Sequence, residues 1–190
     1  MKELLEHIRD QGRIIGEGIL KVDTFLNHAV DVGLVERIGK EFADRFSEAG
    51  ATKVVTVEAS GIAPALFTAR ALGVPLVFAK KSLPATVSEG VHSSLIQSFT
   101  RNKVFDVTIG RHVLRQNDQL LIIDDFLAHG STVAGLIDIG EQAGAIIVGV
   151  GVVVSKAFQG GERALSHTGI DLYSLVTIDG MSGGHYRLRS

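Results

Sequence analysis

The chain has 190 residues, with 19 Lys and Arg against 21 Asp and Glu, and it contains no cysteine. A net charge of −2 argues against a general binder of nucleic acid or membrane surfaces, and the lack of cysteine excludes disulfides, zinc–thiolate sites and cysteine nucleophiles. An apolar fraction of 45% excludes a disordered chain. The N-terminus lacks the apolar core of a signal peptide, and no stretch reaches the ~18 apolar residues of a membrane helix. We therefore expect a cytoplasmic protein with no membrane or nucleic-acid partner.

Along most of the chain, short apolar strands alternate with helices. The first helix is expected over 31–49, where Asp31 is suited to the N-cap, apolar residues recur every four positions and Gly50 ends the pattern. The β-branched run KVVTV at 53–57 is typical of a buried parallel strand. The remaining predicted elements are strands at 75–79, 120–124, 145–154 and 171–178 and helices at 62–72, 131–143 and 161–167. This alternation predicts an α/β fold, a parallel twisted sheet flanked by helices and joined by right-handed crossovers.

Two regions depart from this alternation. Between 80 and 110, the strand-like runs SSLIQSFT and KVFDVTI meet at Arg101–Asn102, which predicts a hairpin that projects from the sheet as a flap. Residues 1–30 and 179–190 fit neither repeat and are expected to form a small hood over one end of the sheet. We therefore expect a single domain over 1–190, with its core at about 31–178.

Charged residues gather where the predicted parallel strands end. Glu58 follows the first strand, Lys80 and Lys81 the second, Asp124 and Asp125 the third, and Lys156 the fourth. Charges also appear at strand ends simply because solvent begins there. Four clusters at one edge nevertheless favour a ligand crevice, since the carboxyl ends of parallel strands form such crevices.

The segment LLIIDDFLAHGST (120–132) carries the most specific pattern. Its small-residue loop enters a helix near Ser131, and free backbone N–H groups with the positive end of the helix dipole suit a phosphate. The acidic pair, Asp124 and Asp125, would repel that phosphate. The two carboxylates are therefore expected to bind a different group, which is a sugar diol, a metal ion or a developing cation. A ligand with a phosphate at one end and a ribose in the middle meets both demands.

Other motifs for phosphate or nucleophilic chemistry do not fit. Gly130 is followed directly by Ser131, without the Lys of a Walker loop, and no GxGxxG follows a strand. The histidines show no HxH or HExxH spacing. GxSxG is absent around Ser60, so the Ala-Ser-Gly turn there is better suited to close approach of an anion.

The segment 120–132 resembles the phosphoribosyl-pyrophosphate (PRPP) motif of the type I phosphoribosyltransferases. Three further stretches are similar to the corresponding stretches of the bacterial xanthine phosphoribosyltransferases, a purine-specific group within that family. They are KVDTFLNH (21–28), EASGIAP (58–64) and SKAFQGG (155–161). The resemblance covers essentially the whole chain, including the flap and both ends. It implies the type I phosphoribosyltransferase fold and a pentosyltransferase activity.

The resemblance also implies roles for individual residues. Asp124 and Asp125 would bond the ribose hydroxyls and stabilise an oxocarbenium-like transition state. Mg²⁺ would arrive with PRPP, with no ligand supplied directly by the protein. Lys81 would reach the pyrophosphate, in its own or the partner subunit, or else be a solvated loop lysine. The residues implied for the 5′-phosphate are Ala128, His129, Gly130, Ser131 and Thr132, and those implied for pyrophosphate are Ala59, Ser60 and Gly61.

For the base, the resemblance implies that Lys156 donates to the 6-oxygen of a purine, with Leu20 and Asn27 completing the pocket and Phe158 either stacking on the base or packing in the core. The implied reaction transfers the 5-phosphoribosyl group of PRPP to N9 of xanthine, giving XMP and pyrophosphate in purine salvage. Guanine, hypoxanthine or adenine are the alternative bases. A non-enzymatic PRPP-binding regulator is less favoured, since a DNA-binding domain does not fit in 30 residues. Relatives are homodimers, so we expect a homodimer here.

Overall fold

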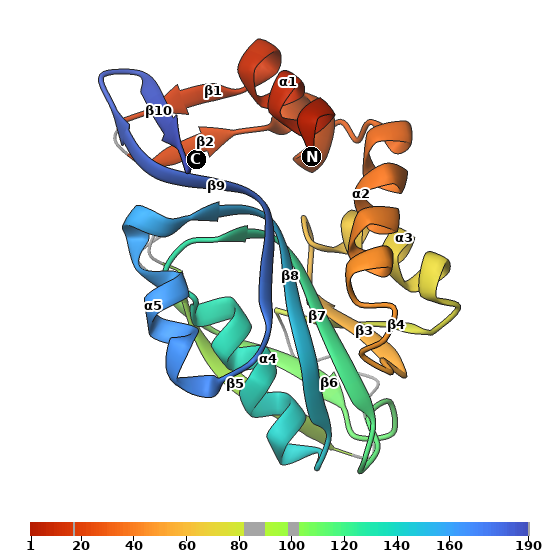
Figure 1. Ribbon diagram of the computed structural model, residues 1–190. Helices are drawn as coiled ribbons and strands as arrows, with labels where there is room; N and C mark the ends of the chain where they lie inside the picture. Colours follow the sequence, from red (N-terminus) through yellow and green to blue (C-terminus); the bar gives the residue numbers. More distant parts are fainter. Residues whose placement is uncertain (17, 82–89, 99–102, 190) are drawn as a thin grey trace.

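A computed structural model describes residues 1–16, 18–81, 90–98 and 103–189 (Figure 1). Within these ranges, a six-stranded sheet has the order β10-β9-β8-β7-β3-β4. All neighbouring strands pair in parallel except β9 and β10, which pair antiparallel. The strands are β3 (Lys53–Val57), β4 (Leu76–Ala79), β7 (Gln119–Leu127), β8 (Ile146–Lys156), β9 (Leu172–Ser182) and β10 (His185–Leu188). The predicted parallel sheet is confirmed.

The two faces of the sheet are covered by different helices. β7 shows why, because consecutive strand residues point to opposite faces: Leu121 and Ile123 pack into one apolar core, and Leu120 and Ile122 into the other. The first core includes the apolar face of α2 and the second that of α4. The helices are α2 (Val32–Arg45), α3 (Ile62–Leu72), α4 (Ser131–Gln142) and α5 (Gly161–Leu165).

The predicted cap at the start of α2 is present, and a glycine ends α3. The Asp31 carboxylate caps α2 by accepting from the N–H of Leu34 at 2.9 Å. Gly73 ends α3 in the left-handed conformation with a φ of 71°. α2, the first helix that the sequence predicts, is shorter than expected. Its α-helical residues stop at Arg45, and a turn carries the chain to Gly50.

The predicted hairpin is confirmed as β5 (Val91–Ser98) and β6 (Lys103–Gly110), paired from Val91↔Gly110 to Ser98↔Lys103. The expected junction at Arg101–Asn102 lies outside the described residues. Ile96, Val107 and Ile109 are buried in the core that α4 shares. An antiparallel bridge between Lys80 and Thr108 fastens the hairpin to the end of β4. The described part of the flap is therefore packed against the core that α4 shares.

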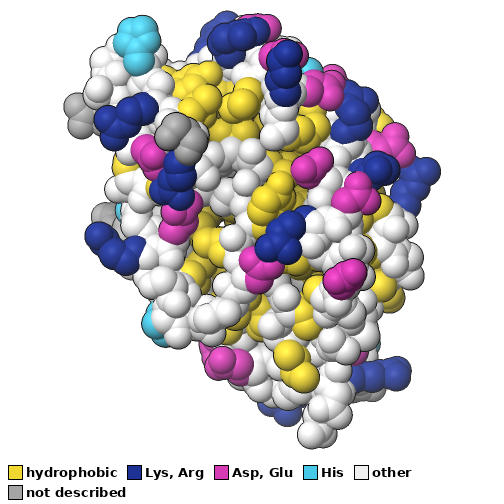
Figure 2. Space-filling view, viewed as in Figure 1, with side chains coloured by type: hydrophobic (Ala, Val, Ile, Leu, Met, Phe, Trp, Pro, Cys, Tyr) yellow, Lys and Arg dark blue, Asp and Glu magenta, His cyan; other side chains and the backbone are white. Residues whose placement is uncertain are grey.

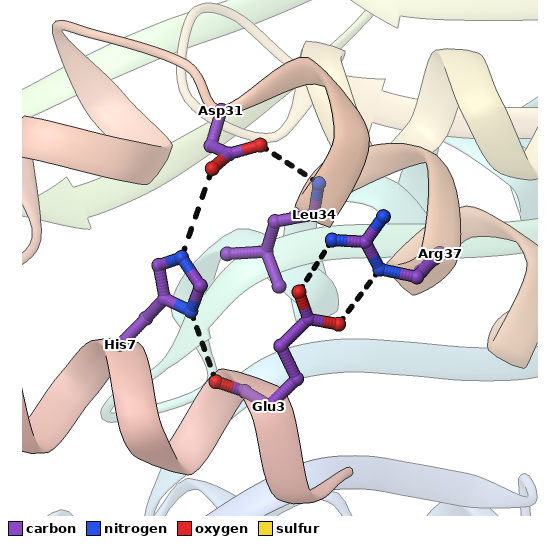
Figure 3. A network of polar contacts seen from close by, with 5 residues as sticks. All are labelled: Glu3, His7, Asp31, Leu34 and Arg37. Atoms are coloured by element: carbon purple, nitrogen blue, oxygen red, sulfur yellow. Dashed lines mark hydrogen bonds and ion pairs between the residues drawn. The ribbon is translucent and has the colours of Figure 1, made fainter.

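The chain begins with α1 (Lys2–Gln11), β1 (Arg13–Ile15), β2 (Ile19–Lys21) and a π-helical turn at Asp23–Asn27. Figure 3 shows how α1 is joined to α2: Glu3 pairs with Arg37, and His7 Nε2 lies 3.7 Å from an oxygen of Asp31. In Figure 1 these elements and the β9–β10 turn lie together above one end of the sheet. The division of the chain into core, flap and hood remains a prediction.

The end of the chain differs from the expectation that 179–190 lie outside the strand pattern. β9 continues to Ser182, and β10 returns antiparallel to it through Gly183 and Gly184, whose φ values are 55° and 77°. Two consecutive residues with positive φ are the requirement of a tight two-residue hairpin, and glycine meets it without strain. Among the described residues, no helix is long and apolar enough to cross a membrane.

Candidate active site

A cleft of about 340 Å³ lies at the carboxyl edge of the parallel strands. It is lined by residues from segments far apart in the sequence, and most of the predicted site residues are among them. Those residues are Leu20, Asn27, Ala59, Ser60, Gly61, Lys81, Asp124, Asp125, Ala128, Thr132 and Lys156. The other three, His129, Gly130 and Ser131, line a hollow of about 50 Å³ together with Ala128 and Thr132. The structure therefore brings the predicted residues into one continuous region.

The acidic pair lies inside β7, not at its end. β7 was expected to finish at Asp124, but its pairing with β8 continues to Leu127↔Ser155. Two adjacent carboxylates read as a strand end in the sequence because they break the apolar run. Here each carboxylate instead accepts from the following N–H, Asp124 from Asp125 at 2.9 Å and Asp125 from Phe126 at 3.0 Å.

Burial dominates the electrostatics of this pair. Asp124 is 6% exposed, and its burial, reinforced by the neighbouring Asp125 carboxylate, raises the pKa of Asp124 well above its usual value. Burial also raises the pKa of Asp125. The charge of Lys81 acts in the opposite direction on both groups. A cation or a hydrogen-bond donor that enters the cleft would therefore stabilise the ionised form of these carboxylates.

The turn between β3 and α3 closes directly on the acidic pair. It contains a cis peptide bond between Glu58 and Ala59. A Cβ on Gly61 would lie 2.2 Å from Thr56 Oγ1 and 2.8 Å from Asp124 Oδ1, so only glycine fits there. The Glu58 carboxylate accepts from the N–H of Lys81 at 2.7 Å, which ties the turn to the end of β4.

The loop between β7 and α4 has the geometry expected of an anion site. Gly130 has a φ of 86° and precedes the first residue of α4, Ser131, so the open N-terminus of this 12-residue helix faces the hollow of about 50 Å³. The hydroxyl of Ser131 donates to the carbonyl of Gln97 in β5 at 2.8 Å. This hydroxyl therefore docks the hairpin, and the backbone N–H groups are the donors directed at the hollow.

The opposite end of the cleft combines a cation, an amide and apolar side chains. Lys156 is half-buried, its Nζ donates to the carbonyl of Gly18 at 3.0 Å, and burial lowers its pKa. The Nζ lies 5.4 Å from the centre of the Phe126 ring. Asn27 Oδ1 is buried and has no hydrogen-bond partner among the described residues. An unpaired buried acceptor in the wall of a cleft is a candidate for a donor supplied by a ligand or by an ordered water.

Comparison with known proteins agrees with this geometry. The model of the phosphoribosyl transferase domain family matches residues 32–168. The chain belongs to the phosphoribosyltransferase family. It is 50% identical over 184 residues to a xanthine phosphoribosyltransferase of Streptococcus agalactiae serotype Ia, covering 97% of this chain and 95% of that protein. It is 46% identical over 178 residues to a xanthine phosphoribosyltransferase of Listeria innocua, covering 94% and 93%.

Solved structures support the same fold. An APRTase from Giardia lamblia, complexed with 9-deazaadenine, matches with a TM-score of 0.76 at 20% identity, covering 92% of this chain and 97% of that one. The adenine phosphoribosyltransferase of Rhodothermus marinus matches with a TM-score of 0.73 at 21% identity, covering 93% and 99%. At such identities the likeness concerns the fold alone.

Sequence reasoning missed four residues that line the cleft of this phosphoribosyltransferase: Ile19, Val57, Phe105 and Phe126. Phe126 was detectable, since it follows the acidic pair on the same strand. Phe105 comes from the hairpin, and no local pattern shows that a flap residue reaches the cleft. Phe158, the candidate for stacking, is 38% exposed in the short turn beyond β8 and is not among the lining residues.

Proposed function

We propose that this phosphoribosyltransferase transfers the 5-phosphoribosyl group of PRPP to N9 of xanthine, releasing XMP and pyrophosphate. One observation carries the proposal: a single cleft joins an anion hollow, a buried acidic pair and a pocket with one lysine and one unpaired amide. The identity of 46–50% to proteins named xanthine phosphoribosyltransferase, over nearly the whole chain, supports the choice of base. Cytoplasmic action as a homodimer is part of the same proposal.

The two ends of PRPP carry charge, and the cleft offers a donor set for each. The backbone N–H groups of 128–132 and the N-terminus of α4 would hold the 5′-phosphate. The Ala59–Gly61 turn approaches closely enough for its backbone to receive pyrophosphate, with Lys81 beside it as a cation. The ribose would then contact Asp124 and Asp125, which line the same cleft as the Ala59–Gly61 turn and Ala128.

The acidic pair would act on the developing charge of the sugar. As the bond to pyrophosphate breaks, positive charge grows on the ribose ring, and carboxylates fixed beside it stabilise that charge more in the transition state than in the ground state. Carboxylate oxygens are also suitable neighbours for Mg²⁺. When it is bound with PRPP, Mg²⁺ would neutralise charge on the leaving pyrophosphate.

The base end of the cleft favours a purine with an oxygen at position 6. Lys156 has only donors, which complement an oxygen and not an amino group. The Asn27 amide presents both an acceptor and donors, so it is suited to read a base N–H together with the 2-oxygen of xanthine. Leu20 is 5% exposed and supplies apolar packing beside them.

The proposal is tested by measuring turnover of xanthine, guanine, hypoxanthine and adenine in parallel with PRPP and Mg²⁺. We expect the highest kcat/KM for xanthine and the lowest for adenine. The Asn27→Ala variant should reduce kcat/KM most for xanthine, because only xanthine pairs its 2-oxygen with the amide that the variant lacks. Hypoxanthine has no 2-oxygen and leaves the amide unpaired in the wild type, at a cost of about 1–3 kcal/mol. A preference for adenine would reject xanthine as the substrate, and PRPP binding without turnover of any base would favour a regulator.

A further inference from the structure

Arg189, the penultimate residue, joins two elements of the fold and has none of the roles assigned above. Its guanidinium donates to Glu162 in α5 at 2.8 Å and to Asp179 in β9 at 3.1 Å. Its backbone N–H donates to the carbonyl of Thr177 at 2.9 Å. The backbone at Arg189 is therefore fixed along β9, and the Arg189 side chain reaches across to α5.

Glu162 is held at both carboxylate oxygens. Oε2 accepts from Arg189, and Oε1 accepts from the hydroxyl of Ser155 at 2.6 Å. Ser155 is fully buried on β8, so the carboxylate is anchored to the sheet. Since α5 has only five residues, few internal hydrogen bonds hold it, and its position depends on such external contacts.

The residue before Glu162 lies against the phosphate loop. The N–H of Gly161 donates to the carbonyl of Ala128 at 3.0 Å. A Cβ on Gly161 would lie 2.6 Å from that carbonyl oxygen and 3.0 Å from the nitrogen of Gly130. α5 therefore begins in direct backbone contact with the loop, and a displacement of α5 would displace the loop residues Ala128 and Gly130.

The outer side of the loop faces a hollow of about 410 Å³, lined by His129, Gly130 and Ser131 on one side and by Leu165 of α5 on the other. Because this space is open, close packing does not support the loop there. The shape of the loop therefore depends more on its hydrogen bonds with Gly161 of α5 and, through Ser131, with β5.

We propose that Arg189 is a positioning residue for PRPP: through Glu162 and Gly161, it holds residues 128–132 in the shape that receives the 5′-phosphate. The proposal rests on the function proposed above, since it takes this loop as the phosphate site. The base end should be affected less, because Ser155 and Lys156 are consecutive on a strand and point to opposite faces.

The test is titration calorimetry of PRPP with Mg²⁺ into the wild type, Arg189→Ala, Arg189→Lys and Glu162→Gln, alongside steady-state KM values for PRPP and for the base. Arg187→Ala is the matched control, since it removes the same charge from an exposed position on β10. We expect Arg189→Ala and Glu162→Gln to raise the Kd of PRPP about tenfold, the scale of a hydrogen bond between charged groups. Arg189→Lys should fall between them and the wild type, because lysine keeps the charge without the planar fork. Arg187→Ala should leave the Kd unchanged.

The outcomes separate the two proposals. If the wild type binds PRPP and the Kd of both Arg189→Ala and Glu162→Gln stays within twofold of the wild type, the positioning role is wrong and the proposed function stands. An equal rise in the KM of the base would also overturn it, because that points to general loosening. If the wild type binds no PRPP, the proposed function fails first. Circular dichroism checks folding, and Glu162→Gln decides the matter if Arg189→Ala does not fold.

Discussion

The buried acidic pair opposes the stability of the fold that presents it. The pKa of Asp124 is raised well above its usual value, chiefly by burial, so its folded pKa exceeds its unfolded pKa. Such a group favours folding only below its unfolded pKa, and that contribution is lost as the pH rises through the folded pKa. Above the unfolded pKa, the cost of burying this carboxylate therefore destabilises the native state, which is the expected price of a preorganised catalytic group.

This predicts opposite effects of Asp124→Asn on stability and on catalysis. The amide keeps the oxygen that accepts from the N–H of Asp125 and cannot ionise. At pH 7 the Tm should rise by roughly 2–4 °C for each kcal/mol gained in the free energy of unfolding. The value of kcat should fall, because about 2–4 kcal/mol of transition-state stabilisation is lost. Thermal melts from pH 4 to 8 and steady-state kinetics measure both. The gain in Tm should shrink at acidic pH.

Asp118→Asn provides the control of opposite sign. Burial raises the pKa of Asp118, but hydrogen bonds from Lys53 and from the N–H of Arg115 outweigh it and lower the pKa overall. Its stabilising contribution is present above the unfolded pKa, so Asp118→Asn should lower the Tm at pH 7 and leave kcat unchanged. A fall in Tm for Asp124→Asn would contradict the assignment of burial as the dominant effect.

A second prediction at this scale concerns Gly61. In Gly61→Ala the new methyl would collide with Thr56 Oγ1 and Asp124 Oδ1, so the turn and the acidic pair cannot both keep their places. We expect a rise in the KM of PRPP of tenfold or more, since misplacement of about 1 Å commonly costs about a hundredfold in rate. In Gly33→Ala, the same methyl meets the flexible end of Arg37 at 3.3 Å, and the KM should not change. Equal KM values in the two variants would show that the turn does not contact PRPP.

At the scale of elements, the sequence was most informative where apolar periodicity and caps coincide. The N-cap residue Asp31 predicted α2, and the apolar runs at 53–57 and 120–123 predicted β3 and the start of β7. The end of β7 was misread because two carboxylates in a strand look like a boundary until the pairing partner, β8, is known. Phe105 was missed for a related reason, since its place in the cleft depends on how the hairpin docks on α4.

The docking of the hairpin is itself testable through Gly135 on α4. A Cβ there would lie 2.8 Å from the Ile96 side chain of β5, so Gly135→Val should push the strand away from the helix. Overpacking of this kind costs about 1–3 kcal/mol of the free energy of unfolding. Ala134→Val, at the neighbouring exposed position, is the size-matched control. Hydrogen exchange should accelerate in residues 91–98 of Gly135→Val alone, and unchanged protection there would show that this contact does not hold the hairpin.

At the scale of the whole molecule, charged and exposed apolar side chains are interspersed over the surface. Figure 2 shows basic and acidic side chains interspersed over the visible face, with hydrophobic side chains between them. The exposed apolar side chains include Val32 in α2, Leu66 in α3 and Phe78 in β4, which are 62%, 51% and 40% exposed. β4 is also an edge strand of the described sheet, so one side of its backbone is open to further contacts.

These features predict that a second copy of the chain covers the β4 edge in a symmetric homodimer. A two-fold interface uses the same surface on both subunits. Because the carboxyl end of β4 leads to Lys81, which lines the cleft, an interface along β4 would place the two active sites near it. Sedimentation equilibrium should give about twice the chain mass of 20.2 kDa at micromolar concentration. The double variant Leu66→Glu, Phe78→Glu should shift the protein to the monomer, because it buries like charges across the two-fold axis. Ile146→Glu, at a 55% exposed position where β8 begins, should leave the dimer intact. A wild type that sediments only as a 20.2 kDa species would reject the dimer, and a dimer that survives the double variant would place its interface elsewhere.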